Sequence, residues 1–245
     1  MRNWRSPALI FANIVFLSAV AAEPAKAPIC PDCAKETAVA VAGAELLYES
    51  AWIDAGKRKN SIPKNFTFKN QDNEPVSAES LCGKPLVITF LYTRCSNAKK
   101  CPLSAATFAR LEVLLKQQDL LQKVRLAIVT FDPEYDSPTI LHSYGKEKGV
   151  TFSPEVMMLQ PDIKQKTALF DALELPVNFS NGRVNIHGIE LILLDSKGQV
   201  AKTYKTVIWD NDKVVKDIQK LILETPDMTV QPEKSEPLQA STKRN

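Results

Sequence analysis

The sequence predicts an α/β fold in which helices flank a central mixed sheet. Two continuous apolar runs, at residues 86–92 and 124–130, are typical of strands that are buried on both faces of a parallel sheet. A helical pattern lies between these runs, and two further β-favouring runs follow closer to the C-terminus. The chain has 245 residues, of which 44% are hydrophobic and 24% charged, so it can bury a sizeable core without relying on disulfides.

The helix between the two apolar runs is expected to begin at Pro102. Its large apolar residues share one face, which makes residues 86–130 a strand-helix-strand unit. Ser137 is the expected N-cap of a second helix, with Pro138 at the first helical position. A capping-box pattern predicts a third helix over residues 162–173.

The C-terminal part of the chain predicts a hairpin followed by a helix. Residues 189–194 and 199–206 favour two antiparallel strands joined by a turn at 195–198. Asp210 is the expected N-cap of the final helix, whose apolar residues face inward. A strand-helix-strand unit followed by a hairpin and a helix is the thioredoxin-like arrangement, and we expect this domain to span residues 61–225.

Both ends of the chain are expected to be flexible extensions of this domain. Residues 1–22 read as a signal peptide, because positive residues precede an apolar stretch and small residues follow it; an uncleaved membrane anchor is the alternative. Residues 23–60 form an N-terminal extension that is expected to be helical over residues 36–50. Residues 226–245 are expected to be a disordered tail.

A signal peptide implies a periplasmic or secreted protein without an integral membrane span. Its removal takes away Arg2 and Arg5, so the formal charge falls from +3 by two units to +1. Such a weak charge gives no electrostatic case for nucleic acid or an anionic membrane as a partner. Nothing in the sequence indicates an obligate oligomer, and we expect a monomer.

The five cysteines form two close pairs, Cys30/Cys33 and Cys95/Cys101, and a single Cys82. Thiol oxidation is the default outside the cytosol, so both pairs are disulfide candidates. Cys30 and Cys33 do not follow a predicted strand, which leaves metal capture, exchange with a partner and a plain local disulfide open. For Cys82 we expect an inert structural role.

Cys95 and Cys101 lie where an open α/β fold carries its ligands, since Cys95 follows the first strand and Cys101 opens the next helix. The helix N-terminus, together with Lys99 and Lys100, favours a thiolate and predicts a lowered pKa for Cys101. Five residues separate the two cysteines, whereas thioredoxin-type catalysts usually have two. A loop of this length permits a disulfide clamp, a redox pair or a metal site.

His187 is one of only two histidines in the chain. We expect it to open the strand at 189–194 and to face the cysteine loop, as strand starts at this place do in thioredoxin-like folds. Two thiolates and one imidazole are a good donor set for copper in either oxidation state. His142, on the second predicted helix, is expected to be a surface residue.

Three stretches of the sequence resemble the Sco/SenC family. Residues 83–102 hold Gly-Lys-Pro, then Phe-Leu-Tyr-Thr-Arg-Cys, then Cys-Pro; residues 130–138 are an aspartate-proline segment; and residues 186–198 are a histidine strand. Together the resemblance covers about residues 62–223. The chain is a variant of this pattern, because the family usually has three residues between its two cysteines rather than five.

The resemblance implies a thioredoxin-like copper-binding protein that assists the assembly of cytochrome c oxidase. In this chain the copper ligands would be Cys95, Cys101 and His187. Asp132 would lie beside them as a supporting group, or serve only as a turn residue before the next helix. The recipient of the metal would be the copper-bearing subunit of the oxidase or another copper protein.

The same residues permit an enzyme, and the choice stays open at this point. A thiol–disulfide oxidoreductase would reduce the cysteines of a copper protein or act as a general periplasmic redox protein. Cys95, expected to be the more exposed thiol, would attack, and Cys101 would be its partner. A thiol peroxidase would share the fold, but the proline-threonine-cysteine pocket of that class is absent from the sequence.

Overall fold

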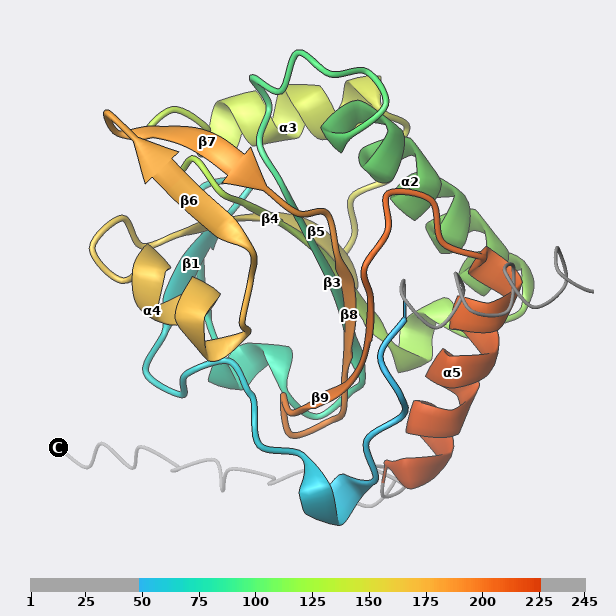
Figure 1. Cartoon of the computed structure of the whole chain (residues 1–245). Coiled ribbons are helices and arrows are strands. Elements are labelled where there is room, and N and C mark those ends of the chain that lie inside the picture. Colours follow the sequence, from blue (N-terminus) through green and yellow to red (C-terminus); the bar gives the residue numbers. More distant parts are fainter. Residues whose placement is uncertain (1–48, 226–245) are drawn as a thin grey trace, which may run out of the picture. The chain divides into compact units, whose positions relative to one another are not determined.

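The computed structural model describes residues 49–225, which form the predicted α/β fold around a seven-stranded mixed sheet (Figure 1). The strands lie in the order β2-β1-β5-β4-β3-β8-β9. Strand β3 pairs in parallel with β4 on one side and antiparallel with β8 on the other. The sheet consists of β1 (Thr67–Asn70), β2 (Pro75–Ser77), β3 (Leu86–Leu91), β4 (Arg125–Thr130), β5 (Val156–Pro161), β8 (Leu191–Leu194) and β9 (Val200–Tyr204).

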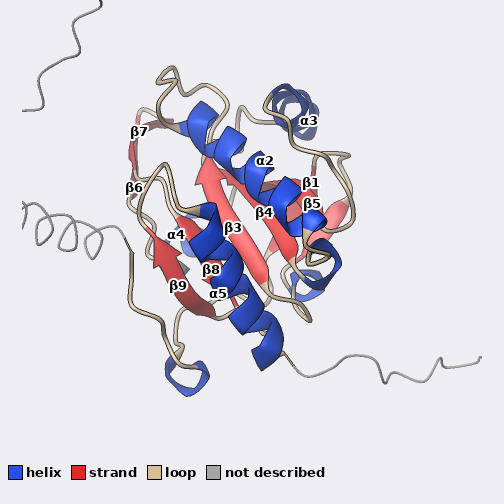
Figure 2. Ribbon diagram, turned by 90° about the vertical axis from the view of Figure 1, so that its right-hand side faces the viewer, coloured by secondary structure: helices blue, strands red, loops and turns tan. Residues whose placement is uncertain are grey.

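Helices cover both faces of this sheet. Because side chains alternate along a strand, β3 directs Val87 and Leu91 into the core beneath α2 and α5, and Ile88 and Phe90 into the core beside α4. Figure 2 shows α2 and α5 lying across one face. Burial on both faces is why the sequence of β3 is an unbroken apolar run. The helices are α2 (Cys101–Gln117), α3 (Pro138–Glu147), α4 (Lys166–Ala172) and α5 (Asn211–Glu224). Short 3-10 turns lie at Ala55–Lys57, Glu79–Leu81 and Leu121–Lys123.

Two predicted helix starts are confirmed. The Ser137 hydroxyl accepts a hydrogen bond from the backbone N–H of Ile140 at 3.5 Å, and Pro138 is the first residue of α3. The Asp210 carboxylate accepts hydrogen bonds from the first backbone N–H groups of α5. These caps satisfy N–H groups that have no partner within their helix, so each helix begins at a defined residue.

A two-stranded ribbon of β6 (Val177–Ser180) and β7 (Arg183–His187) lies outside the main sheet. The expectation that His187 opens a strand over 189–194 was wrong, because His187 ends β7 and β8 begins only at Leu191. The two ribbon strands alternate apolar and polar residues and are half-exposed, so they lack the continuous apolar run that marks a strand of the central sheet.

The predicted helix over 162–173 is shorter than expected, because α4 begins at Lys166. The Asp162 carboxylate accepts hydrogen bonds from the N–H groups of Lys164 and Gln165 and so closes a turn before the helix. Asp162 therefore organises a turn rather than capping α4, because short polar side chains commonly hydrogen-bond the nearby backbone.

Several expectations fall on residues that the structure does not describe. They are the signal peptide at 1–22, the Cys30/Cys33 pair, most of the helix expected at 36–50 and the tail at 226–245. At the end of that expected helix, Glu49 and Ser50 pair with β9 instead.

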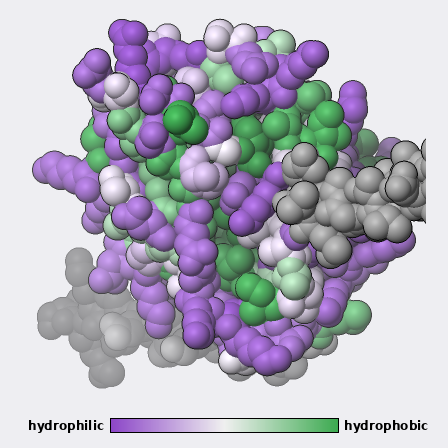
Figure 3. Space-filling view, viewed as in Figure 1, coloured by the Kyte–Doolittle hydropathy of each residue, from purple (hydrophilic) through white to green (hydrophobic). Residues whose placement is uncertain are grey.

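Within residues 49–225, no helix is long and apolar enough to cross a bilayer. The surface seen in Figure 3 is mainly hydrophilic, with hydrophobic side chains gathered in patches between the polar ones. This pattern is ordinary for a folded domain and marks no site by itself.

Candidate metal centre

The three predicted ligands meet at the carboxyl end of β3. The Sγ atoms of Cys95 and Cys101 and a ring nitrogen of His187 all lie within 4.8 Å of one another. The Cys101 Sγ lies 3.4 Å from the His187 Nε2. All three residues are buried, with exposed fractions of 8% for Cys95, 0% for Cys101 and 8% for His187. Cys101 and His187, which are 86 positions apart in the sequence, thus join Cys95 in one compact group of two sulfurs and one nitrogen.

The loop between the two cysteines is folded by its own polar groups. Asn97 organises it, since its side-chain oxygen accepts from the N–H of Lys99 at 3.0 Å and its carbonyl accepts from the N–H of Lys100 at 2.9 Å. Cys101 is the first residue of α2. The five-residue spacer therefore forms a tight turn that returns the chain to Cys95. Sequence analysis gave no role to Asn97, although an Asx residue in a short loop is a recognised turn signal.

His187 is held in place by the end of the ribbon. It pairs with Val177 across β6 and β7, and the next residue, Gly188, donates its N–H to the carbonyl of Pro176 at 2.8 Å. A Cβ atom at position 188 would lie 2.4 Å from the Pro176 ring, which is too close for any side chain. Glycine is therefore required beside the histidine so that the ribbon can turn the imidazole toward the cysteines.

Burial reverses the pKa that sequence analysis predicted for Cys101. The helix N-terminus was expected to lower the pKa of this thiol, but its loss of hydration raises the pKa well above the usual value. The pKa of His187 is lowered, first by burial and then by the positive charge of Lys100. The group thus holds a neutral imidazole, which is the ligating form, beside a thiol that must lose a proton to bind a metal.

Tyr92 is a site residue that sequence analysis did not single out. Its ring meets the imidazole of His187 edge-on, with 5.1 Å between the ring centroids. Burial, followed by the neighbouring charges of Cys95 and Cys101, raises the pKa of Tyr92 to about 12, and the Tyr92 carbonyl accepts a hydrogen bond from the Cys95 N–H at 3.3 Å. Tyr92 therefore touches two of the three ligands. Its position directly after β3, at the edge where Cys95 lies, was the signal in the sequence.

Asp132 supports the site only indirectly. Its carboxylate accepts a hydrogen bond from the Nε of Arg94 at 3.1 Å, and the Arg94 guanidinium stacks 4.1 Å from the centre of the Tyr135 ring. Asp136, which was not predicted, holds the loop directly: it accepts from the Thr93 N–H at 3.0 Å. These two carboxylates fix the residues before Cys95 rather than touching the ligands.

The remaining predicted residues take minor places. Cys95 and Cys101 are free thiols, so the proposed disulfide between them stays a prediction. Cys82 is a free, half-buried thiol near the opposite end of β3, and burial raises its pKa, in keeping with an inert role. His142 is half-buried on α3 and lies 3.3 Å from the Asp72 carboxylate.

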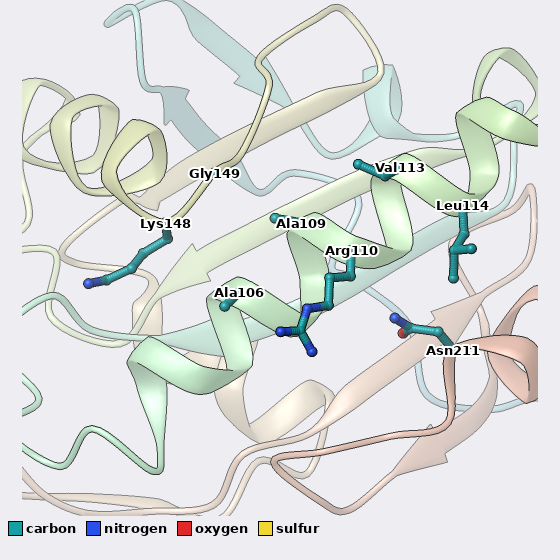
Figure 4. Close-up of a pocket in the computed structure, with 8 residues that line it drawn as sticks. All are labelled: Ala106, Ala109, Arg110, Val113, Leu114, Lys148, Gly149 and Asn211. Carbon is teal, nitrogen blue, oxygen red and sulfur yellow. The ribbon is translucent and has the colours of Figure 1, made fainter. Parts of the chain in front are cut away.

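An open groove of about 560 Å³ runs along α2 between the end of α3 and the start of α5 (Figure 4). It is lined by Ala106, Ala109, Arg110, Val113, Leu114, Lys148, Gly149 and Asn211. None of the three ligand residues lines it, so the groove and the metal centre are separate features.

The family model described as SCO1/SenC matches residues 54–223. The chain belongs to this family. The resemblance inferred from the sequence motifs is thereby confirmed, and the matched range covers the two cysteines, the histidine and all of the sheet.

Individual relatives agree with this assignment. A SCO1 protein homolog of Bacillus subtilis is 34% identical over 87 residues, which are 36% of this chain and only 43% of that protein. The structure of BsSco, described as having a disulfide switch and as a member of the Sco family of cytochrome c oxidase assembly proteins, is 25% identical with a TM-score of 0.58, over 68% of this chain and 96% of that one. Yeast Sco1 with copper bound has the same fold, with 20% identity and a TM-score of 0.54 over 71% of this chain and 96% of that one.

Proposed function

We propose that this protein binds copper(I) through Cys95, Cys101 and His187 and delivers it during the assembly of cytochrome c oxidase. The observation that carries the proposal is the convergence of two thiols and an imidazole within 4.8 Å. Thiolates are soft ligands that select copper(I), and the imidazole also suits copper(II). The chemistry of this donor set therefore fits copper.

The burial of the site favours stepwise ligand exchange over free release. Cys101 is fully buried, whereas Cys95 is 8% exposed and lies in the loop. A recipient thiol therefore reaches the ion from the side of Cys95 or of His187, which is also 8% exposed, and the buried Cys101 is released last. Because each intermediate keeps sulfur or nitrogen ligands, the ion does not have to pass through water.

The recipient that we propose is the copper-bearing subunit of cytochrome c oxidase, reached outside the cytoplasm. Two points support this. BsSco is described as a member of a family of cytochrome c oxidase assembly proteins, and residues 1–22 of this chain have the sequence pattern expected of a signal peptide.

A transfer assay tests the proposal. The reduced protein is loaded with one equivalent of copper(I) and mixed anaerobically with the purified copper domain of the oxidase subunit, and copper on each protein is measured after separation. We expect transfer from the parent and from Cys82→Ser, the matched control, but far less from Cys95→Ser or Cys101→Ser, which should hold the ion much more weakly. Equal transfer from all four proteins would contradict the proposal.

The two neighbouring thiols also support a second function, the reduction of a disulfide on a copper protein. The Cys95 thiolate would attack the partner disulfide, and Cys101 would then attack Cys95, so that two electrons leave this pair and the partner is released as a dithiol. A redox titration of the Cys95/Cys101 pair separates the functions. A potential far below that of the surrounding thiols would describe an inert disulfide and would exclude the reductase.

A further inference from the structure

A cavity of about 300 Å³ lies at the amino end of β3, opposite to the metal centre. Leu86, the first residue of this strand, lines the cavity. The strand ends at Leu91, and its two ends are roughly 17 Å apart at about 3.3 Å per residue. None of the three candidate copper ligands lines the cavity, so the cavity and the metal centre are separate features.

Backbone hydrogen bonds hold the walls of this cavity. The Ile62 N–H, in the segment before β1, donates to the carbonyl of Gly198 at 3.3 Å. The Gly83 N–H, which follows the 3-10 turn at Glu79–Leu81, donates to the carbonyl of Ser196 at 2.7 Å. Segments that are distant in the sequence are thereby joined around the cavity. Because the fold fixes its walls, the cavity is formed before a ligand enters, as most small-molecule sites are.

The inner wall of the cavity is apolar. It consists of aliphatic side chains from the core beside α4, each with an exposed fraction of 7% or less: Ile62, Ala78, Leu81 and Leu86. An alkyl group placed against these side chains leaves water, and each methylene buried in this way raises the affinity about fourfold. The wall therefore favours a ligand with an aliphatic body.

The outer lining of the cavity carries an excess of positive charge. Lys64 and Lys197 are exposed and line it, and within residues 49–225 neither ammonium forms an ion pair. Glu79, also exposed, is the single acidic residue among the described residues that line the cavity. Two unpaired ammonium groups against one carboxylate leave a net positive charge, which favours an anionic ligand.

Cys82 provides a chemical reporter in the wall of the cavity. Its thiol is half-buried, and the Sγ hydrogen-bonds the carbonyl of Ala78 at 3.5 Å. Burial raises the pKa of this thiol most, and the charges of Glu79 and Lys64 act on it in opposite directions. The charged groups of the outer lining are therefore close to the Cys82 thiol, and a ligand held between them and the apolar wall covers it.

We propose that this cavity binds a small amphipathic carboxylate, a free fatty acid about as long as octanoate. The alkyl chain lies against the apolar wall, and the carboxylate lies within reach of the ammonium groups of Lys64 and Lys197. At about 30 Å³ for each non-hydrogen atom, the share of one molecule in liquid water, the cavity holds roughly ten such atoms, which is the size of octanoate. This inference does not depend on the proposed copper function.

Protection of Cys82 from alkylation tests the inference. The copper-free, reduced full chain is titrated with sodium octanoate and treated with iodoacetamide, and the alkylation rate at each cysteine is measured by mass spectrometry of the digested protein. We expect a saturable slowing at Cys82 of at least about fivefold, because a pocket encloses most of its ligand. The dissociation constant should be on the order of 0.1–1 mM for a ligand of this size. The rate at Cys95 in the same samples should not change.

Two analogues test the chemistry of the ligand. Hexanoate, which is two methylenes shorter, should bind about fifteenfold more weakly than octanoate. Octylammonium, which has the same chain and the opposite charge, should not protect Cys82 at concentrations where octanoate saturates. If octylammonium protects Cys82 as well as octanoate does, the cavity does not select an anion and the inference is overturned.

Three variants test the residues, with circular dichroism to confirm that each is folded. K64Q/K197Q should bind octanoate about fivefold more weakly than the parent, because two exposed charge contacts are lost. Glu79→Gln should bind it about twofold more tightly, because one repulsion is removed. Lys59→Gln, the control, changes an exposed lysine that does not line the cavity and should have no effect. No protection of Cys82 up to about 10 mM octanoate, or equal affinity in K64Q/K197Q and the parent, overturns the inference.

Discussion

Thiols lie near both ends of β3, but within residues 49–225 only the carboxyl end gathers several side chains that could hold a metal. At the carboxyl end, Cys95 and Cys101 share a buried space with His187. At the other end, the Cys82 Sγ hydrogen-bonds the carbonyl of Ala78 at 3.5 Å, and Cys82 lines a cavity of about 300 Å³. Burial raises the pKa of both Cys82 and Cys101, so acidity does not distinguish the two ends. The convergence of several donors does.

The end of the sheet that lacks the metal site is built for stability. Arg58 is buried there, and its guanidinium binds Asp195 at 2.9 Å and Glu224 at 2.7 Å. This network joins the chain before β1 to the turn after β8 and to the end of α5. The comparison teaches that the domain keeps the ion pairs that stabilise it and the group of candidate metal ligands at opposite ends of β3.

The largest effect is expected from removing a sulfur ligand. Cys95→Ser or Cys101→Ser should weaken copper(I) binding by more than about 1,000-fold, beyond the roughly 10–100-fold that supporting residues of metal sites contribute. Cys82→Ser should leave the affinity unchanged. Competition titrations with a copper(I) chelator measure both. If Cys82→Ser weakened binding as much as Cys95→Ser, the two ends of β3 would not differ as we describe.

A stability effect should appear at the opposite end without any change in copper binding. Arg58→Met leaves the buried Asp195 carboxylate without its charge partner, which should lower the free energy of unfolding by roughly 3 kcal/mol. Urea denaturation of the copper-free protein measures the loss. An unchanged unfolding midpoint, or a loss of copper affinity in the folded variant, would speak against the division between the two ends.

Copper binding should become tighter as the pH rises. Because burial raises the pKa of Cys101, this thiol is protonated at neutral pH and must release its proton to the solvent when copper binds. The apparent affinity should gain about tenfold per pH unit for each proton released. The lowered pKa of His187 keeps its imidazole neutral above pH ~6.5, so it adds no proton in this range. Between pH 7 and 8.5, the slope of log affinity against pH should be smaller by one proton in Cys101→Ser than in the parent. Equal slopes in the two proteins would show that the Cys101 thiol is not the source of the released proton.

The smallest effect is expected at Tyr92. Tyr92→Phe removes the hydroxyl beside Cys95 but keeps the ring against His187, so copper affinity should fall only about fivefold, the size of one ordinary polar contact. Tyr135→Phe, an exposed control beside Arg94, should have no effect. A chelator competition that ranks these two variants the other way would show that Tyr92 does not position the ligand.

The sequence was informative wherever apolar patterns or caps decide the structure. The runs that became β3 and β4 and the caps at Ser137 and Asp210 follow from local patterns, and the meeting of Cys95 with His187 was expected although the strand that carries His187 was not. The β6–β7 ribbon was missed because its strands are short and half-exposed and carry no continuous apolar run.

The details of the site depended on tertiary packing that no local pattern records. The helix N-terminus does favour a thiolate at Cys101, but complete burial has the larger effect and raises the pKa instead. Asp132 lies near the loop as predicted, yet Arg94 engages its carboxylate. The contact of Tyr92 with His187 depends on a ribbon that the sequence did not reveal.

X-ray absorption of the copper(I)-loaded protein, compared with His187→Ala, tests the central claim most directly. To report on this centre alone, both proteins carry C30S/C33S. We predict two sulfur ligands and one nitrogen ligand around copper in the protein that retains His187, and two sulfur ligands without the nitrogen in the His187→Ala variant. The same ligand count in both proteins would contradict the three-ligand centre.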